Sequence, residues 1–328
     1  MRSTLIRPKL KLAAFSFALL ISRLAYGQAL PFGAIGGEPL LNTFQIEVLG
    51  PSLTSERSDE TVTHFRADAF IPISQSDVDA YAIQIRGTRL TLDKDRIPAG
   101  GVATIPKDLG SIAIGPFMRR KLESGDTIAS DVQIGRSGTD LGSGSTATTV
   151  SANVFWGRPK DADGGQWIYL LSYSNSRSSF AGIPIPGFAY AKTFKTESSQ
   201  GLWAAGAPFF FTMIRSQPWS ATAFLSPFTA FVEGGYSLYG PFALFARFGW
   251  QPQGFKVNGG PSERVLFEEF RTTLGVRGPI ARWAMATVGV AYSDGRRVAW
   301  GDSLTKSSSY ESRLDDELTL LLSFSGRF

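Results

Sequence analysis

Few side chains in this sequence could carry acid–base or metal chemistry, and their types limit what is available. The chain has one histidine, His64, and no cysteine. The lack of cysteine excludes disulfides, thiolate zinc sites, thiol nucleophiles and an acylated amino-terminal cysteine. One histidine also excludes multi-histidine metal sites. His64 could serve as the base of a serine hydrolase, but no G-x-S-x-G segment marks a nucleophile.

Two other patterns do not indicate a catalytic or phosphate-binding site. Glu268 and Glu269 are adjacent, and neighbouring residues of a strand face opposite ways, so these carboxylates cannot converge on one substrate. The glycine-rich segments 32–37 and 141–146 lack the lysine and the strand-to-helix setting of a phosphate-binding loop. We therefore predict no catalytic residue, no metal and no cofactor, and keep a hydrolase centred on His64 as a minor alternative.

The positive charge is concentrated at the amino terminus. The 328 residues carry a net charge of +5, and the first 27 hold five basic residues and no acid, which leaves 28 basic against 28 acidic residues in the remainder. We therefore expect no nucleic-acid partner. Residues 12–21 (LAAFSFALLI) form an apolar run that is too short for a membrane helix of about 20 residues. With Ala25 and Gly27 before a cleavage point, residues 1–27 are predicted to be a secretory signal peptide.

Residues 28–328 show period-two alternation and no sustained helical periodicity, which predicts a single all-β domain of about 12–14 strands. Apolar residues share one face of each strand. The other face carries charged side chains, which we predict to be inward-facing; they are Arg66, Asp68, Arg86, Arg119, Asp131, Glu233, Arg247, Glu269, Arg271 and Arg277.

Two architectures fit this alternation: a soluble β-sandwich or propeller, and a closed antiparallel transmembrane β-barrel. Aromatic residues near strand ends, such as Trp156 and Trp167, favour the barrel, because barrels place amphipathic rings at the two membrane interfaces. Short links near Gly240 and Gly278 alternate with long polar ones such as residues 251–264. Outer-membrane barrels likewise combine short periplasmic turns with longer external loops.

The carboxyl terminus carries the most specific signal. The chain ends in an alternating strand that closes on an aromatic residue, and the apolar positions are Leu320, Leu322, Phe324 and Phe328. In this respect the sequence resembles bacterial outer-membrane β-barrel proteins, although Gly326 stands where a larger apolar residue is usual. The resemblance implies that these four residues form the signal read by the barrel-assembly machinery.

On this interpretation the protein is a porin-like barrel in the bacterial outer membrane that lets small polar solutes pass passively. The partners implied are outer-membrane lipid, the barrel-assembly machinery, periplasmic chaperones and the solutes. A non-conducting barrel with a structural or surface-binding role through its loops is the main alternative. A lipid hydrolase centred on His64, as found on some barrels of this kind, is the less favoured one.

Overall fold

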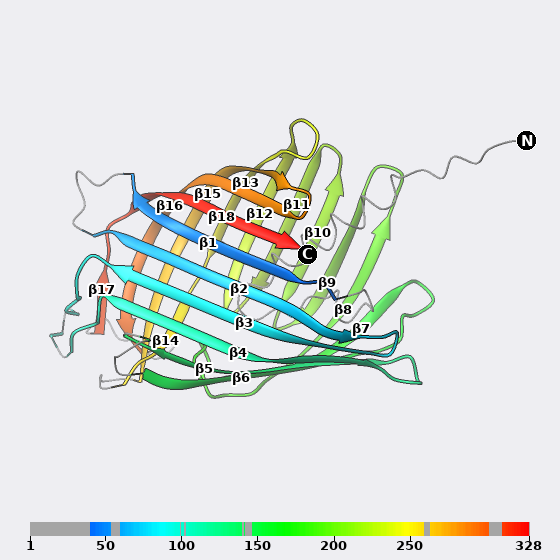
Figure 1. Cartoon of the computed structure of the whole chain (residues 1–328), viewed down its shortest axis with the longest axis horizontal. Coiled ribbons are helices and arrows are strands. Elements are labelled where there is room, and N and C mark those ends of the chain that lie inside the picture. The colour runs from blue at the N-terminus through cyan, green and yellow to red at the C-terminus, as the bar shows by residue number, and fades with distance from the viewer. Residues whose placement is uncertain are drawn as a thin grey trace, which may run out of the picture.

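The structure is a computed structural model that describes residues 40–53, 60–98, 100–101, 103–139, 141, 146–258, 263–301 and 310–327. The expected signal peptide, residues 1–27, and Phe328 lie outside these ranges. All named elements of the described part are β-strands (Figure 1). The strands are β1 (Thr43–Ser52), β2 (Val62–Gln75), β3 (Asp79–Leu92), β4 (Asp108–Lys121), β5 (Thr127–Gly138), β6 (Thr146–Gly157), β7 (Gly165–Ser174), β8 (Ile185–Lys195), β9 (Gln200–Ala207), β10 (Phe210–Ser216), β11 (Trp219–Ser226), β12 (Thr229–Ser237), β13 (Ala243–Trp250), β14 (Gln253–Lys256), β15 (Arg264–Ala281), β16 (Ala284–Trp300), β17 (Glu311–Arg313) and β18 (Glu317–Arg327).

The strands close into one antiparallel barrel. Each strand of the wall pairs with the next one in sequence, and β18 pairs with β1, from Thr43 opposite Arg327 to Ser52 opposite Thr319. The short strand β14 pairs with residues 264–267 at the start of β15, and the short strand β17 pairs with residues 297–299 at the end of β16. Sixteen strands therefore make the wall, and closure pairs the backbone groups of every edge.

The predicted fold class, a closed antiparallel transmembrane-type barrel, is confirmed, and the wall has sixteen strands where about 12–14 were expected. The difference arises in β9 to β12, which are only 7 to 9 residues long. Phe210 is exposed on the outer face while its neighbour Phe211 is buried inside. Because both faces are apolar here, the period-two signal disappears and adjacent strands merge in the sequence pattern.

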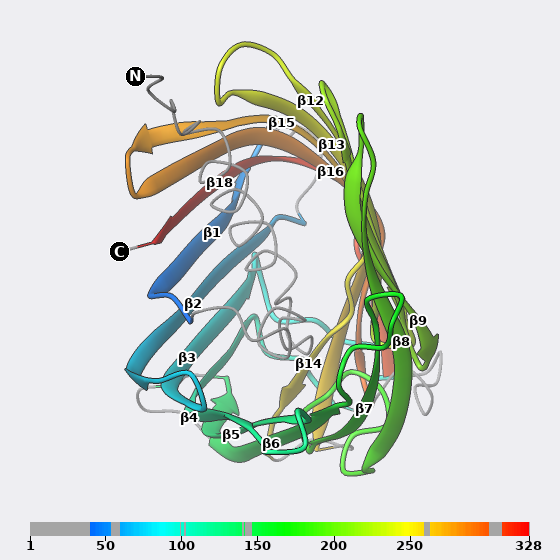
Figure 2. The same cartoon turned by 90° about the vertical axis from the view of Figure 1, so that its right-hand side faces the viewer.

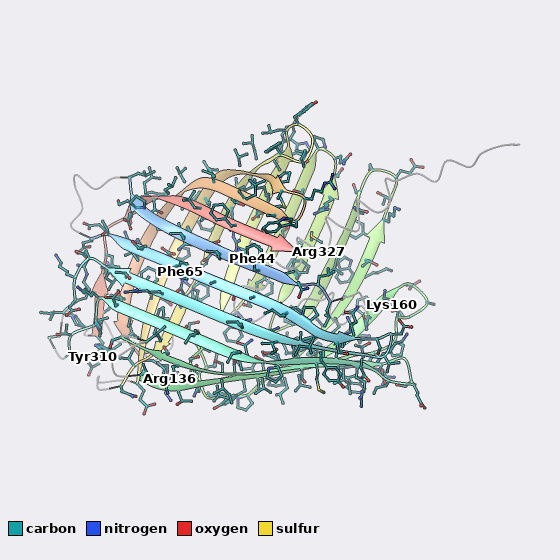
Figure 3. All side chains as sticks on the ribbon, viewed as in Figure 1. Phe44, Phe65, Arg136, Lys160, Tyr310 and Arg327 are labelled. Atoms are coloured by element: carbon teal, nitrogen blue, oxygen red, sulfur yellow. The ribbon has the colours of Figure 1, made fainter. Side chains whose placement is uncertain are left out.

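Because the strand number is even, β1 begins and β18 ends at the same end of the barrel, which we call the terminal end. Short turns connect the strands there, for example residues 76–78 and 217–218. The opposite end, the loop end, carries longer connections such as residues 93–107 and 301–316, with the exceptions of 208–209 and 227–228. In Figure 3, Lys160 marks the terminal end, and Arg136 and Tyr310 mark the loop end.

The turn predicted near Gly278 lies a few residues further along the chain. Gly278 and Pro279 lie inside β15, and the turn to β16 is formed by Arg282 and Trp283. The last pair of β15 with β13 is Arg277 with Ala243, so Pro279 has a neighbouring strand on the β16 side only. A proline lacks the N–H that a second partner would need, and an edge position tolerates it.

The outer surface is apolar. Strand residues that face outward include many exposed aliphatic side chains, such as Ile114 (53 %), Val232 (53 %) and Leu274 (54 %). Aromatic side chains are exposed near the terminal end, where Trp219 contacts Tyr236 at 4.7 Å between ring centroids. Others, such as Tyr292, are exposed toward the loop end. An apolar band between two aromatic girdles is the surface that a lipid bilayer solvates.

Apolar clusters also fill parts of the interior that the strands enclose in Figure 2. One lines the wall from β3 to β12 and includes Phe117, Phe155 and Phe211. The other, at the loop end, joins the inner faces of β2 to β4 to those of β14 to β16 and includes Phe255, Phe267 and Trp300. The space between these clusters holds the polar side chains described next.

Candidate functional site

The structure places all ten predicted charged residues on the inner side of the wall. Asp131, Glu269 and Arg271 are buried at 4, 2 and 6 % exposure, whereas outward neighbours on the same strands, such as Val132 (43 %), are exposed. The other seven are Arg66, Asp68, Arg86, Arg119, Glu233, Arg247 and Arg277. Their inward placement follows from the period of two, because each differs in parity from the exposed apolar residues beside it.

Several of these residues form ion pairs with one another or hydrogen bonds with a nearby polar side chain. Asp68 accepts from Arg66 at 2.6 Å and lies 3.3 Å from Arg86. Arg277 donates to Glu233 at 2.6 Å. Asp131 accepts from the amide of Asn153 at 3.1 and 3.2 Å. Pairing compensates charges that burial would otherwise make costly.

The imidazole of His64 contacts an amide and a carboxylate. Its Nδ1 lies 3.3 Å from Nε2 of Gln253, and its Nε2 lies 3.9 Å from Oε1 of Glu269. Glu269 also pairs with Arg271 and accepts from Ser293. Among the described residues no serine hydroxyl is bonded to the imidazole, so the nucleophile–base contact of a serine hydrolase is missing from this geometry.

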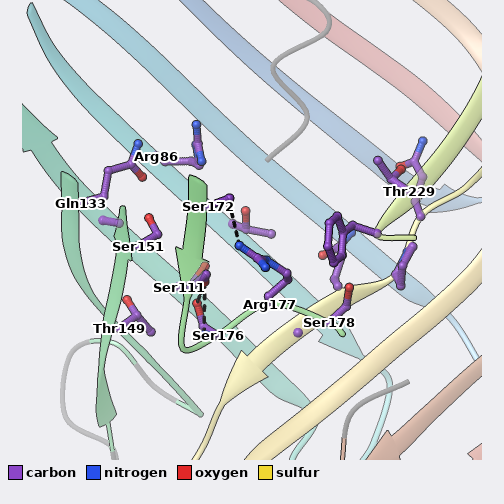
Figure 4. A pocket seen from close by; sticks show the side chains of 18 of the residues that line it. Arg86, Ser111, Gln133, Thr149, Ser151, Ser172, Ser176, Arg177, Ser178 and Thr229 are labelled. Carbon is purple, nitrogen blue, oxygen red and sulfur yellow. Dashed lines mark hydrogen bonds between the residues drawn. The ribbon is translucent and has the colours of Figure 1, made fainter. Parts of the chain in front are cut away.

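A cavity of about 280 Å³ lies inside the barrel. One side is polar, with hydroxyl groups from β4, β6 and β7 and the guanidinium groups of Arg66 and Arg86. The other side is aromatic, with Phe209, Phe224 and Phe228. We call this space the main cavity; Figure 4 shows its polar lining. Its two-sided character provides separate contacts for a charged group and for an apolar body.

A smaller cavity of about 40 Å³ lies along the inner faces of β12, β13, β15, β16, β18 and β1. Glu47, Gln251 and Arg271 line both spaces. Glu233 and Arg247 complete the charged lining of the smaller one. The Arg277–Glu233 pair extends this polar track toward the terminal end.

The connection from β13 to β15 crosses the lumen. It carries β14, which pairs with β15 on one side of the barrel. The amide of Lys256 donates to Oγ of Ser137 on β5 at 3.0 Å, and the side-chain amide of Asn258 donates to the carbonyl of Thr146 on β6 at 3.0 Å. Because β5 and β6 are seven and eight strands from β15 in a wall of sixteen, this segment spans the full width of the barrel.

An ion network accompanies the apolar cluster at the loop end. Arg96 binds Glu60 and Asp93, each at 2.6 Å, and Arg296 binds Glu317 at 2.9 Å. The indole of Trp300 donates to the carbonyl of Ala103 at 3.2 Å. These contacts hold the loop-end connections against the mouth of the barrel and narrow it.

Three of the four residues predicted to form the assembly signal, Leu320, Leu322 and Phe324, lie on β18. Phe324 is 45 % exposed on the outer face, and Leu320 and Leu322 share its parity. Gly326 lies opposite Phe44 in the β1–β18 pairing, and a Cβ at Gly326 would overlap the Phe44 ring. Phe44 therefore covers the outward position where a larger apolar residue was expected.

Sequence reasoning missed the residues of the connections. Arg177, Ser176 and Ser178 line the main cavity from the β7–β8 connection, and Gln251 and Gln253 line it from the crossing segment. The signal that could have pointed to them is the run of serines at alternate positions, Ser172, Ser174, Ser176 and Ser178, which carries the inward parity of β7 into its loop.

Among the described residues no group of three metal-binding side chains gathers. The same part of the chain contains no helix with the length and apolar character needed to cross a bilayer.

The sixteen-stranded closed wall, its apolar outer band and its polar interior define the class: the fold is that of bacterial outer-membrane β-barrel proteins. No family model and no curated protein matches the sequence. Similar solved structures include an outer membrane channel from Pseudomonas putida F1 (10 % identity, 92 % of this chain and 100 % of that chain, TM-score 0.37). The Pseudomonas putida toluene transporter TodX gives 10 % identity over 89 and 90 % of the two chains and a TM-score of 0.39.

LpxR from Salmonella typhimurium gives 8 % identity over 87 % of this chain and 100 % of that chain, with a TM-score of 0.36. At these identities and scores the overlaps carry no argument about the activity of the present chain, so its function is argued from its own interior.

Proposed function

We propose that the protein is a passive, non-catalytic channel of the bacterial outer membrane for small polar solutes. The observation that carries this proposal is that two internal cavities lie side by side and share the lining residues Glu47, Gln251 and Arg271. Charged side chains of both signs line this track, and such linings set the solute preference of a pore. Lipid solvates the outer band, and export by a signal peptide and insertion by the barrel-assembly machinery, with periplasmic chaperones, complete the proposed biogenesis.

The crossing segment and the loop-end cluster favour a second candidate, a barrel that does not conduct and acts through its loops. Both features narrow the lumen. The two candidates differ in one measurable property, because only the channel passes ions when the folded protein is inserted into a planar bilayer.

The test compares two neighbouring residues of β15. Thr273 lines the smaller cavity and is 5 % exposed, while Thr272 has the opposite parity and is exposed on the outer face. Thr273→Trp should fill the track and reduce single-channel conductance severalfold, whereas Thr272→Trp should leave it unchanged. Heat-modifiable gel migration verifies that both variants fold. Absence of conductance in well-folded wild-type protein, or equal conductance in both variants, would contradict a channel along this track.

A further inference from the structure

Arg177 presents an uncompensated positive charge to the main cavity. It lies on the β7–β8 connection, is 3 % exposed and lines the cavity (Figure 4). Its Nη2 donates to Oγ of Ser172 at 2.7 Å, and its guanidinium carbon lies 4.7 Å from the centre of the Phe228 ring. Its Nε and Nη1 are buried and have no hydrogen-bond partner.

This arrangement differs from that of several other inward arginines. Arg66, Arg277 and Arg296 each pair with a carboxylate at 2.6 to 2.9 Å. Within the described part of the chain no carboxylate lies at ion-pair distance from Arg177, and burial lowers the pKa of its guanidinium to about 10. At neutral pH the group therefore remains charged while several of its N–H donors are unused, which is costly unless an anion occupies the site.

Hydroxyl groups surround this charge. Ser172, Ser174, Ser176 and Ser178 come from β7 and its loop, and Ser111, Thr149 and Ser151 line the same wall from β4 and β6 (Figure 4). Ser172 also donates to Oδ1 of Asn153 at 2.6 Å, and the Ser174 and Ser176 hydroxyl oxygens lie 3.4 Å apart. Because the Ser172 hydroxyl already donates to Asn153, the donors left for the oxygens of a carboxylate or another oxyanion are the Arg177 guanidinium and the other hydroxyl groups.

An apolar surface also adjoins Arg177. Phe209 and Phe224 stack at 6.4 Å between ring centroids, and Phe228 contacts Phe180 edge-on at 6.3 Å. Leu170 and Phe155 extend this surface. A cavity of about 150 Å³ is enough for benzene, so a volume of about 280 Å³ accommodates a ring together with its anionic substituent.

We propose that the main cavity binds a small organic carboxylate, with its anionic group on Arg177 and the neighbouring serines and its hydrocarbon body on Phe209, Phe224 and Phe228. The inference deepens the proposed function, since it names the class of solute that the lumen takes up. It does not require conduction, because binding to this cavity is measurable in detergent solution.

The experiment measures benzoate binding to the folded, detergent-solubilised protein by titration calorimetry, with benzyl alcohol as a neutral analogue of similar shape and inorganic phosphate as an anion without an apolar body. Benzoate should bind saturably and at least about tenfold more tightly than either analogue, since charge-assisted hydrogen bonds and apolar contacts each contribute that much. Arg177→Gln should weaken benzoate binding about tenfold or more and leave benzyl alcohol unaffected.

Arg158→Gln is the matched control, because Arg158 lies at the terminal end over the Trp156 ring and away from the cavity lining. Equal binding of benzoate and benzyl alcohol to wild-type protein overturns the proposal even if Arg177→Gln does not fold. Equal affinity of benzoate for Arg177→Gln and wild type also overturns it. If phosphate binds as tightly as benzoate, the proposal of an organic carboxylate is wrong and the site takes an inorganic anion. A protein that conducts but binds no benzoate would refute this inference and leave the channel intact.

Discussion

The side-chain amide of Gln253 lies 3.3 Å from Nδ1 of His64 and ties the crossing segment to β2. Three strands, β16, β18 and β1, separate β2 from β15, with which β14 pairs. Together with the bonds of Lys256 and Asn258 to β5 and β6, this contact anchors the segment at three places around the wall. The sequence's single histidine therefore has a structural partner in the constriction of the lumen.

Loosening the crossing segment should widen the lumen. A Cβ at Gly254 would lie 2.7 Å from the carbonyl oxygen of Ser176 and 3.0 Å from the amide nitrogen of Ser178. Gly254→Val should push β14 away from the β7–β8 connection and raise single-channel conductance about twofold or more. Gly234→Val is the matched control, since a Cβ there meets nothing within 4 Å on the outer face. Unchanged conductance in Gly254→Val would show that this segment does not limit the passage.

The Glu233–Arg277 pair should control ion selectivity along the polar track. Nη2 of Arg277 lies 2.6 Å from Oε1 of Glu233, and the side chains are 10 % and 11 % exposed, respectively. Glu233→Gln removes the negative partner and leaves the guanidinium to attract anions, so anion permeability relative to cations should rise severalfold. The reversal potential across a KCl gradient measures this ratio.

Two comparisons complete that measurement. Glu233→Gln combined with Arg277→Gln should return the ratio toward that of wild type, because both charges are gone. Glu197→Gln, at an exposed turn of the terminal end, should have little effect. A ratio that shifts equally in Glu197→Gln would assign selectivity to the mouth of the barrel instead of the track.

The closed barrel and the inward parity of the ten charged residues were predictable from the sequence because strand alternation is a local property. Asp131 and Val132, for example, are neighbours on one strand with opposite parity, and Asp131 is buried while Val132 is exposed. The strand count was not readable where the inside is also apolar: Phe211 and Met213 pack in the lumen, so hydrophobicity no longer distinguishes inside from outside.

The cavity itself could not be predicted from the sequence. Arg177 lies about fifty residues from Phe228 in sequence and stacks on it only because barrel closure brings the β7–β8 and β11–β12 connections together. Likewise, Gln253 meets His64 over 189 residues of sequence. Apart from the serines that continue the alternation of β7 to Ser178, these loop residues carry no periodic signal, so their partners become visible only when the sheet has been closed.

Because Phe44 packs on Gly326, the stability of the β1–β18 pairing that closes the barrel should depend on side-chain size at Gly326. Gly326→Val introduces atoms into the space of the Phe44 ring, and overpacking of this kind costs about 1–3 kcal/mol. The variant should unfold at a lower temperature than wild type in heat-modifiable gel migration. Gly87→Val, where the nearest atom to the new Cβ is 3.9 Å away, should migrate like wild type. Combining Gly326→Val with Phe44→Ala should recover part of the loss, and no recovery would point to another cause.

A turn at the terminal end should contribute slightly to the stability of the folded barrel, and this contribution should be lost in acid. Asp161 lies between β6 and β7 and accepts from the Tyr190 hydroxyl at 2.7 Å and from the Gly165 amide at 2.8 Å. These hydrogen bonds, that of Tyr190 first, hold the pKa of Asp161 below its ordinary value of 3.8. A carboxyl whose pKa is lowered by folding stabilises the folded state above its ordinary pKa, and this contribution is lost as the pH falls through the lowered value.

Tyr190→Phe should therefore lower the unfolding midpoint slightly at neutral pH, and its difference from wild type should shrink as the pH falls below 3.8. Midpoints measured by heat-modifiable migration between neutral pH and acid test this dependence. Tyr239→Phe is the control, because Tyr239 is 87 % exposed in another turn of the same end. A difference between Tyr190→Phe and wild type that stays constant across this range would show that the Tyr190 hydroxyl acts through packing and not through the charge of Asp161.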